Sequence, residues 1–376
     1  MEKIKNLLEI EKQRRTMLLE NPEQEKLILN NLQKDFLKIA YMMTSTKAGG
    51  GSKIILEHAN YLTQRGHKIY IISHQDKPTW FELNNNVEFI QVPYENIVAE
   101  SIPKDIDVIV STTPSSIYEC IQQKIAPVIY FEQGDHHLFD RSVDSKERLD
   151  FISKEYSVCN NIFTVSNYAR EKILEIYNKD SFVIPNAVNN DVFYMKKNIN
   201  KNNVPHIVAI GGEDWEFKGI KYILDAVNKL KEKHDINFTW ITPRNPITQI
   251  EKTIVNPEQI VIGETLRNAD IYICASNYES FGLPILEAMS CGACVITTDV
   301  GGNREFCIDK ENCLIINKKD VNDIVDKVEI LLKDESLRKK LVENAYKKSC
   351  EYSWENTIDE LEKYYRKIAQ YSIEKL

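Results

Sequence analysis

The chain has 376 residues, of which 43% are hydrophobic and 28% are charged, and its formal net charge is −8 at pH 7. This length exceeds one ordinary hydrophobic core and predicts two domains of a soluble globular protein. No apolar run approaches the roughly eighteen residues of a transmembrane helix, and the negative charge argues against nucleic acid, whose phosphates need clustered Lys and Arg.

The first segment, residues 1–35, carries apolar residues at helical spacing among mixed acids and bases, which predicts a helix broken near Pro22. It has no signal-peptide cleavage site, so a cytoplasmic protein is expected, with membrane association left open. Either this helix docks on the body of the protein or it binds a protein partner or a membrane surface. Its balanced charges do not favour attraction to anionic lipid.

From residue 36 onward, apolar strands alternate with amphipathic helices, which indicates parallel sheets covered by helices on both faces. The first series of strands is expected in segments 36–44, 67–74, 87–93, 107–114, 127–134, 161–166 and 181–187. The second series is expected in segments 204–212, 236–243, 259–263, 270–276, 293–299 and 313–317. The polar, Asn-rich segment 186–203 between them has the composition of an interdomain linker.

The predicted fold class is therefore α/β, with two doubly wound, Rossmann-like domains facing each other across a cleft. The domains are expected at residues 36–188 and 189–352, after the helical extension 1–35. A C-terminal helix, 353–376, either stays with the second domain or crosses back to the first. Ligands of such sheets bind beyond the carboxyl ends of the strands, so the site is expected in the cleft.

The segment NYESFGLPILEAMSCGACVITTDVGG, residues 277–302, carries the strongest functional signal. Glu279 ends a strand and its loop, and Glu287 lies eight positions later inside the next helix. The first turn of that helix has free backbone N–H groups at the positive end of the helix dipole, which suits a diphosphate. The residues of this turn are Phe281, Gly282 and Leu283. Glu287 is then placed to bind a ribose diol, and Glu279 to face a sugar ring.

This segment resembles the retaining GT-B glycosyltransferases of family 4, also called group 1. In that family two glutamates separated by seven residues flank an FG-x-P loop, and a helix EAM-x-x-G and a strand follow. Here Ala288, Met289 and Gly292 match in order, as do the downstream Gly pair and Glu305. The resemblance implies that Glu287 binds the ribose of a nucleotide sugar and that Glu279 contacts the donor sugar.

The resemblance extends through most of residues 36–350. Gly50 and Gly51 stand at the family's glycine turn, where the backbone approaches the donor phosphate or the acceptor, although the turn alone is equally typical of a plain tight loop. Lys218 and Gly219 match a Lys-Gly pair whose lysine binds the donor diphosphate as a point charge. Further matches are Val165–Ser166 and the segment Pro185–Asn189.

Some positions depart from the family pattern. An arginine expected before Lys218 is replaced by Gly212 or Glu213, and we take Arg244, in the loop after the next strand, as a candidate substitute cation. Two smaller departures, Ala187 for glycine and Asn189 for aspartate, fall in the linker.

A histidine that many members carry near the reacting sugar is replaced by Gln133, which can bind a sugar hydroxyl but cannot move protons at neutral pH. His136 and His137 follow, and for each a place in a surface loop and a substrate role stay open.

Two short patterns point elsewhere and are set aside. Asp105 and Asp107 spell the D-x-D pattern of metal-dependent GT-A enzymes, but they precede a strand instead of following one, so no metal is expected. Cys291 and Cys294 form a C-x-x-C pair between a helix end and a strand, without the second pair that a zinc site needs.

The resemblance implies transfer of a sugar from a nucleoside diphosphate, with UDP the expected carrier, to a carbohydrate, lipid-linked or protein hydroxyl, with retention and without a cofactor. The leaving phosphate would help to deprotonate the acceptor. Bacterial surface polysaccharide, teichoic acid or glycolipid synthesis is the expected setting. A GT-B epimerase or phosphorylase is an alternative, and so is a non-catalytic binding subunit, which the missing arginine and histidine favour and the retained glutamates oppose.

Overall fold

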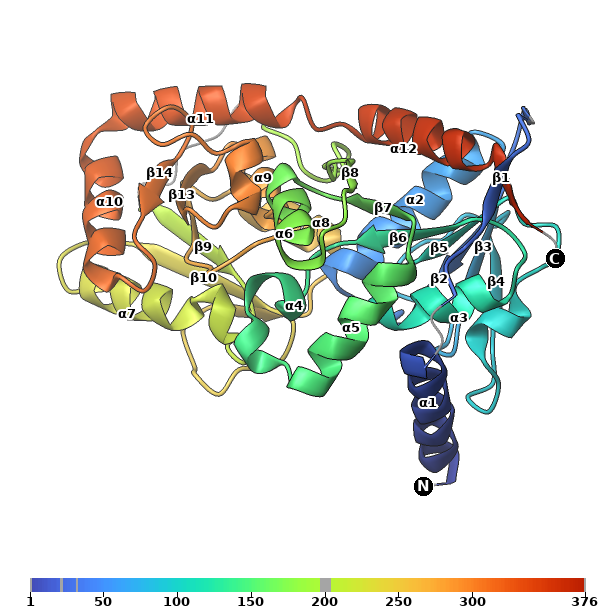
Figure 1. Ribbon diagram of the computed structural model, residues 1–376. Coiled ribbons are helices and arrows are strands. Elements are labelled where there is room, and N and C mark those ends of the chain that lie inside the picture. The colour runs from blue at the N-terminus through green and yellow to red at the C-terminus, as the bar shows by residue number, and fades with distance from the viewer. Residues whose placement is uncertain (1, 21–22, 32, 197–203, 375–376) are drawn as a thin grey trace. The chain divides into compact units, whose positions relative to one another are not determined.

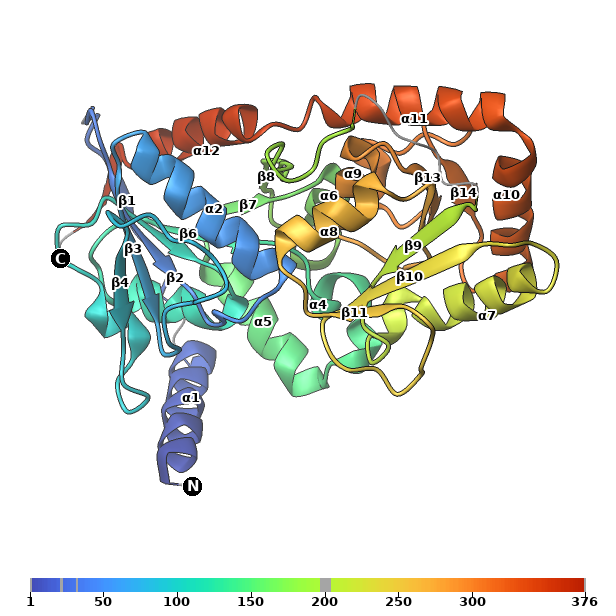
Figure 2. The same cartoon turned by 180° about the vertical axis from the view of Figure 1, so that it is seen from behind.

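A computed structural model of the protein describes residues 2–20, 23–31, 33–196 and 204–374 (Figures 1 and 2). The chain forms two compact units. One consists of Met1–Pro185 and Glu355–Leu376, and the other of Asn186–Trp354. Within the described residues, no helix is both long and apolar enough to cross a lipid bilayer.

The first unit is built on a seven-stranded parallel sheet with the strand order β4-β3-β2-β5-β6-β7-β8. The strands are β2 (Lys38–Met42), β3 (Lys68–Ser73), β4 (Glu88–Gln91), β5 (Val108–Ser111), β6 (Val128–Glu132), β7 (Asn161–Thr164) and β8 (Phe182–Val183). Because the chain adds strands first to one side of β2 and then to the other, the order reverses between β2 and β5. In sheets of this kind ligands bind at that point, beyond the carboxyl ends of the strands.

Helices cover both faces of this sheet (Figure 1). They are α2 (Gly50–Gln64), α3 (Ile117–Gln122), α4 (His136–Phe139), α5 (Lys146–Val158), α6 (Asn167–Tyr177) and α12 (Trp354–Ile368). Side chains alternate along each strand, so Ala40 and Met42 join the core packed under α3 and α5. On the opposite face Tyr41 contacts α12, where its hydroxyl lies 2.8 Å from that of Tyr365.

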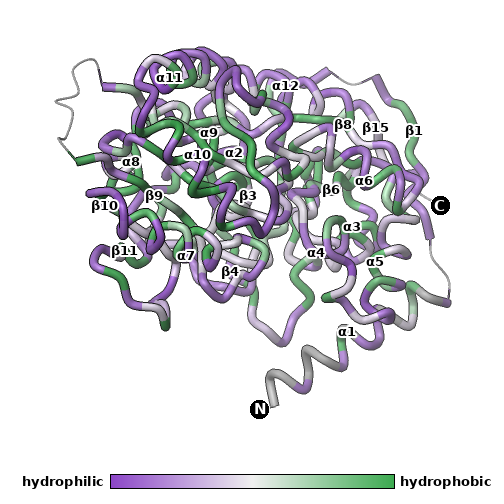
Figure 3. The backbone as a smooth tube through the Cα atoms, turned by 90° about the vertical axis from the view of Figure 1, so that its left-hand side faces the viewer, coloured by the Kyte–Doolittle hydropathy of each residue, from purple (hydrophilic) through white to green (hydrophobic). Residues whose placement is uncertain are grey.

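The prediction of a helix over residues 1–35, broken near Pro22, is wrong for the part after the break. The helix α1 (Glu2–Glu20) is followed by a short apolar strand, β1 (Leu27–Leu29), which pairs antiparallel with β15 (Tyr371–Ile373) (Figure 3). The partner of β1 lies at the other end of the chain, so local spacing could not reveal it. The expected break near Pro22 lies outside the described residues.

The helix α1 docks on the first unit. Leu18 is fully buried in the core of that unit, and Nη1 of Arg14 lies 2.7 Å from a carboxylate oxygen of Glu119. The Arg14 guanidinium also lies 6.0 Å from the centre of the Phe151 ring.

The second unit is built on a six-stranded parallel sheet with the order β11-β10-β9-β12-β13-β14. The strands are β9 (His206–Ile210), β10 (Asn237–Thr242), β11 (Thr253–Val255), β12 (Ile271–Cys274), β13 (Cys294–Thr298) and β14 (Leu314–Ile316). The helices are α7 (Ile220–Lys231), α8 (Gln259–Arg267), α9 (Leu283–Ser290), α10 (Val321–Lys333) and α11 (Glu335–Ser349). Here the strand order reverses between β9 and β12.

The strand predicted at 259–263 is wrong, because these residues begin the helix α8. A short apolar run fits a buried strand and a helix equally well by spacing alone. In the structure Ile260 is 46% exposed, and Gly263 packs so closely that a Cβ atom there would lie 2.5 Å from the carbonyl oxygen of Val192. The edge strand instead is β11, at 253–255.

The segment between the two units is anchored where it is described. The backbone N–H of Val188 donates to the carbonyl oxygen of Tyr352 at 3.1 Å, and Phe193 is buried. On the other side of the boundary, the Thr357 hydroxyl donates to the carbonyl oxygen of Pro185 at 2.9 Å. The remainder of the predicted linker, residues 197–203, lies outside the described residues.

Candidate functional site

An ion pair spans the reversal point of the second sheet. Nζ of Lys218, in the turn after β9, donates to Oε1 of Glu279, in the loop after β12, at 2.7 Å. The Ser276 hydroxyl donates to the same oxygen, also at 2.7 Å. Both charged side chains are largely buried, with 17% of Lys218 and 12% of Glu279 exposed. Burial alone would lower the pKa of Lys218, but the negative charge of Glu279 and its hydrogen bond outweigh this and raise it.

The position of Lys218 is fixed by the glycine that follows it. Lys218 ends a short 3₁₀ turn, and Gly219 then adopts a left-handed conformation with φ +65° before α7 begins. A Cβ atom on Gly219 would lie 2.0 Å from the carbonyl oxygen of Ala275, in the loop after β12. Only glycine therefore allows the two loops to approach closely enough for the ion pair.

The position of Glu279 is fixed by the glycines after β13. The backbone of Glu279 forms a parallel bridge with Gly301, and the N–H of Gly302 donates to the Glu279 carbonyl oxygen at 3.1 Å. A Cβ atom on Gly302 would lie 2.2 Å from the carbonyl oxygen of Ser280. The buried Asn303 amide closes this loop by donating to the carbonyl oxygen of Thr298 at 2.8 Å. The Gly pair of the sequence motif thus supports Glu279.

The helix α9 begins at the glycine of the predicted phosphate loop. Gly282 has φ +93° and caps the helix, whose first residue is Leu283. The N–H groups of Ile285 and Leu286 donate to the carbonyl oxygen of Gly282 at 3.0 and 3.3 Å. Pro284 has no N–H, so the groups suited to an anion at this helix end are the N–H groups of Gly282 and Leu283. Phe281 is buried against the rings of Phe306 and Tyr352. This packing holds the loop, and it leaves the backbone N–H groups of the first turn as the groups suited to an anion.

Glu287 lies on the second turn of α9 and is only 6% exposed. A carboxylate at this depth needs polar partners. It follows the helix start by little more than one turn, which agrees with the geometry expected of a residue that binds beside a phosphate loop.

Arg244 and Glu213 both form contacts between the loop that follows β9 and the loop that follows β10. Nη1 of Arg244 lies 2.8 Å from Oδ2 of Asp214, and both side chains are exposed. The Glu213 carboxylate accepts the N–H groups of Ile247 at 2.8 Å and Thr248 at 3.2 Å. At the position where the family has arginine, this chain therefore has a residue that ties the two loops together, which the sequence did not indicate.

In the first unit, two predicted residues from different turns lie together. A Cβ atom on Gly51, in the first turn of α2, would lie 3.3 Å from Nε2 of Gln133, which follows β6. The corresponding position on Gly50 has no atom within 4 Å among the described residues. His136 is half-buried and begins α4, and its N–H donates to the capping carboxylate of Asp135 at 2.7 Å.

Both alternatives that the sequence left open for His137, a place in a surface loop and a contact with substrate, are wrong. Its ring is fully buried, with Nδ1 2.9 Å from the Tyr177 hydroxyl and Nε2 3.3 Å from Oε2 of Glu132. It is therefore neither a surface-loop residue nor placed to touch a substrate. The sequence analysis missed Glu132, a charged last residue in a strand that is otherwise apolar and aromatic.

The two patterns that were set aside have structural explanations. Oδ2 of Asp107 accepts the N–H of Lys38 at 2.8 Å, and Asp105 and Asp107 form ion pairs with Lys38 and Lys34. They are strand-entry residues, as predicted. Cys291 and Cys294 are buried free thiols, and burial raises the pKa of each to about 12.

Both units match models of glycosyltransferase families. The model described as "Glycosyl transferases group 1" matches residues 191–348, and the model described as "Glycosyltransferase Family 4" matches residues 48–192. The matched regions include Gly50, Gly51 and Gln133 in the first unit, and Lys218, Glu279 and Glu287 in the second.

Curated relatives are also glycosyltransferases. An uncharacterized glycosyltransferase of Methanocaldococcus jannaschii is 28% identical over 228 residues, which are 57% of this chain and 62% of the relative. The N,N'-diacetylbacillosaminyl-diphospho-undecaprenol alpha-1,3-N-acetylgalactosaminyltransferase of Campylobacter jejuni is 29% identical over 168 residues, 43% of this chain and 44% of that protein. The chain thus spans less than two thirds of the length of these relatives.

The predicted fold is confirmed by solved structures. HepE from Anabaena, crystallised with UDP and glucose, is similar to this chain with a TM-score of 0.71 and 15% identity, over 87% of this chain and 98% of that one. At this identity the similarity establishes the fold.

Proposed function

The chain belongs to the group 1 glycosyltransferases of family 4 and has their two-domain GT-B fold, and from this premise we propose that it transfers a sugar from a nucleoside diphosphate to an acceptor hydroxyl. The observation that carries this proposal is the ion pair of Lys218 and Glu279 at the reversal point of the second sheet. Glu279 lies in the loop that leads into α9, whose N-terminus is suited to bind an anion.

Each part of the proposed site binds a different part of the donor. Lys218 and the first-turn N–H groups of α9 stabilise the charge that develops on the leaving diphosphate. Glu287 accepts the ribose hydroxyls. Glu279, whose Oε1 is already held by Lys218 and Ser276, offers its other oxygen to a hydroxyl of the donor sugar.

UDP is the nucleotide that we propose for the donor, because the similar HepE structure contains UDP and glucose. Retention of the anomeric configuration follows from the family resemblance: the leaving phosphate would take the acceptor proton on the same face of the sugar. In this mechanism Lys218 stays protonated, consistent with the raised pKa that Glu279 gives it.

The acceptor that we propose is a carbohydrate hydroxyl, free or on a lipid-linked saccharide. The Campylobacter jejuni relative is named for transfer to a diphospho-undecaprenol-linked sugar. In the first unit, Gln133 and His136 contribute polar groups at the carboxyl ends of the strands, which suit hydroxyl recognition.

A donor screen tests the proposal. Purified full-length protein is incubated with a panel of nucleoside-diphosphate sugars, with and without simple saccharide acceptors, and released nucleotide is measured. Turnover of one donor by the wild type, and at least a hundredfold slower turnover by Lys218→Met and Glu279→Gln, is the expected result. Folded protein that releases no nucleotide from any donor would instead favour the non-catalytic binding subunit.

A further inference from the structure

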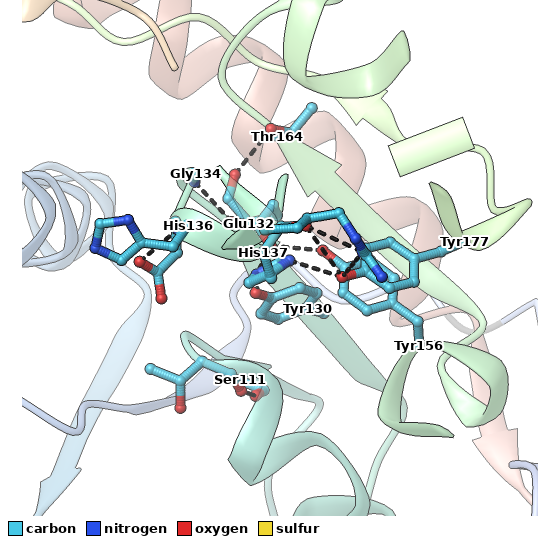
Figure 4. A network of polar contacts seen from close by, with 12 residues as sticks. Ser111, Tyr130, Glu132, Gly134, His136, His137, Tyr156, Thr164 and Tyr177 are labelled. Atoms are coloured by element: carbon cyan, nitrogen blue, oxygen red, sulfur yellow. Dashed lines mark hydrogen bonds and ion pairs between the residues drawn. The ribbon is translucent and has the colours of Figure 1, made fainter. Parts of the chain in front are cut away.

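A network of buried polar groups fixes the end of β6 in the first unit (Figure 4). At its centre is Glu132, the last residue of the strand, which is 2% exposed. Oε2 accepts hydrogen bonds from the hydroxyls of Tyr130 at 2.6 Å and Tyr156 at 2.5 Å, and lies 3.3 Å from Nε2 of His137. Oε1 accepts the backbone N–H of Gly134 at 2.6 Å. Every group around the carboxylate is a donor, which is the environment of an ionised acid.

His137 carries the network outward from this carboxylate. Its Nδ1 lies 2.9 Å from the Tyr177 hydroxyl, which also accepts from Nη1 of Arg141 at 3.4 Å and donates to the His137 carbonyl oxygen at 3.5 Å. The His137 ring therefore lies between the carboxylate of Glu132 and the hydroxyl of Tyr177.

The surroundings of Glu132 also set its pKa. Burial by itself would raise the pKa of Glu132, but the positive charge of His137 and the hydrogen bonds from His137, Tyr130 and Tyr156 outweigh it and lower the pKa. The carboxylate is tolerated at this depth because its two oxygens accept three hydrogen bonds.

The network does more than fill the core, because it forms hydrogen bonds to the chain on both sides of one turn. Glu132 holds the turn through Gly134, whose φ of +94° suits glycine, and the Thr164 hydroxyl donates to the Glu132 carbonyl oxygen at 2.8 Å. On the far side, Nη1 of Arg141 donates to the His137 carbonyl oxygen at 3.3 Å. The residues between these anchors are Gln133, Gly134, Asp135 and His136.

The turn between these hydrogen bonds, Gln133–His136, directs polar side chains away from the network. In Figure 4 the His136 ring points away from the ring of His137, although the two residues are adjacent. The Gln133 amide lies beside Gly51 of α2, so it reaches from the end of β6 past β5 to the turn after β2. That is the reversal point of the first sheet, where ligands of such sheets bind.

We propose that the buried pair of Glu132 and His137 positions the turn Gln133–His136 for the reacting sugars, so that these two residues govern turnover without touching a substrate. The inference rests on the proposed glycosyl transfer. It assigns the two as positioning residues that act through the main chain at Gly134 and through the start of α4.

The first measurements do not need activity. In full-length protein labelled with ¹⁵N-histidine, the ring signals of His137, identified by their absence in His137→Gln, are expected to shift in Glu132→Gln, because the ring lies beside that carboxylate. Hydrogen exchange at the Gly134 amide is expected to be slow in the wild type and at least a hundredfold faster in Glu132→Gln. Unchanged His137 ring signals, or unchanged protection of Gly134, in Glu132→Gln overturns the proposal.

The kinetic measurement uses the donor found in the screen, with UDP binding measured by calorimetry. Glu132→Gln is expected to lower kcat at least tenfold while the Kd for UDP changes less than twofold, and the milder Tyr177→Phe is expected to shift kcat in the same direction. The matched control is Glu155→Gln, another fully buried glutamate of the first unit, which accepts the N–H of Tyr118 instead. It is expected to keep the wild-type kcat.

Two outcomes of these experiments are distinct. Equal losses of kcat in Glu132→Gln and Glu155→Gln would reduce the network to a stabilising role and overturn the inference. A wild type that turns over no donor would overturn the proposed function. It would also overturn the claim that Glu132 and His137 govern turnover. The ¹⁵N and exchange measurements would then still decide whether the pair holds the turn.

Discussion

The ammonium group of Lys218 lies 2.7 Å from Oε1 of Glu279, 61 positions further along the chain. The contact exists because the turn after β9 and the loop after β12 meet where the strand order of the second sheet reverses. Because both side chains are largely buried, each depends on the other to offset the cost of its burial.

Replacement of Lys218 by methionine is expected to impair both turnover and stability. Loss of one preorganised group that stabilises a leaving anion typically slows turnover by about 10²–10³. Leaving Glu279 without its cation is expected to cost about 3 kcal/mol in the free energy of unfolding. Steady-state kinetics and urea denaturation measure the two effects.

The control for this substitution is Lys231→Met, which removes an exposed ion pair with Glu251 in the same unit. Its turnover and unfolding midpoint are expected to match the wild type, because exposed pairs contribute little. A Lys218→Met protein with wild-type kcat/KM would remove the proposed role of the lysine.

The ribose assignment of Glu287 can be tested with a matched ligand. Loss of hydrogen bonds from a buried carboxylate to hydroxyls costs about 1.5–3 kcal/mol, so Glu287→Ala is expected to weaken UDP binding by about 10- to 100-fold. The same variant should bind 2′,3′-dideoxy-UDP as the wild type does, because that ligand lacks the two hydroxyls. If both ligands lose affinity equally, Glu287 supports the loop and does not bind ribose.

Gly219→Ala tests whether the close approach of the two loops is required. The new Cβ atom would lie 2.0 Å from the Ala275 carbonyl oxygen, at a residue with φ +65°. Either the loops separate or the backbone is strained, and the expected loss of unfolding free energy is about 3 kcal/mol or more. Gly50→Ala is the control, since its Cβ atom meets nothing within 4 Å among the described residues, and its unfolding midpoint should not fall.

The glutamates and the helix start of the candidate donor site could be proposed from the sequence because they lie in one continuous segment, whereas Lys218 lies 61 positions before Glu279. Glu279, Gly282 and Glu287 share a loop and the helix after it, and local rules for helix ends predict an anion site there. The alternation of strands and helices likewise predicted two parallel sheets, although it could not separate helix from strand at 259–263.

The parts that the sequence missed depend on contacts between distant segments. The Glu132 network draws on β6, α4, α5 and α6, and β1 pairs with a strand at the other end of the chain. A charged residue closing an otherwise apolar strand was the one available signal for Glu132. It indicates a buried acid, but it does not identify the histidine that lies beside it.

Two buried acids in the first unit are expected to make stability depend on pH. Burial raises the pKa of Glu25 and of Glu155 to about 8, although a backbone N–H bonds to each and partly offsets the effect. In the unfolded chain both lose their protons near pH 4.5. Between these values the folded protein retains protons that the unfolded chain releases, so stability is full below about pH 4.5 and falls as pH rises towards 8, by up to about 1.4 kcal/mol per pH unit for each group.

Glu155→Gln isolates this effect, because the amide oxygen can still accept the N–H of Tyr118. The difference in unfolding free energy between variant and wild type should be small at pH 5 and should favour the variant increasingly up to pH 8. Urea denaturation at pH 5, 6.5 and 8 measures it. A constant difference across this range would mean that Glu155 does not titrate between the two pKa values.

Arg244 is the remaining candidate for the cation that the family supplies from the turn before Lys218. Its guanidinium is held by Asp214 at 2.8 Å in an exposed pair, so an anion that it binds must compete with a weakly held partner. Arg244→Ala is therefore expected to weaken UDP binding about five- to tenfold, and Asp214→Asn to strengthen it by freeing the arginine. Glu213→Gln, in the same loop, keeps an acceptor for the N–H groups of Ile247 and Thr248 and serves as the control for loop geometry. Titration calorimetry with UDP at low and high salt measures all three, because a charge contact of this kind weakens as salt increases. Unchanged affinity in Arg244→Ala would leave Lys218 and the N-terminus of α9 as the groups that bind the diphosphate.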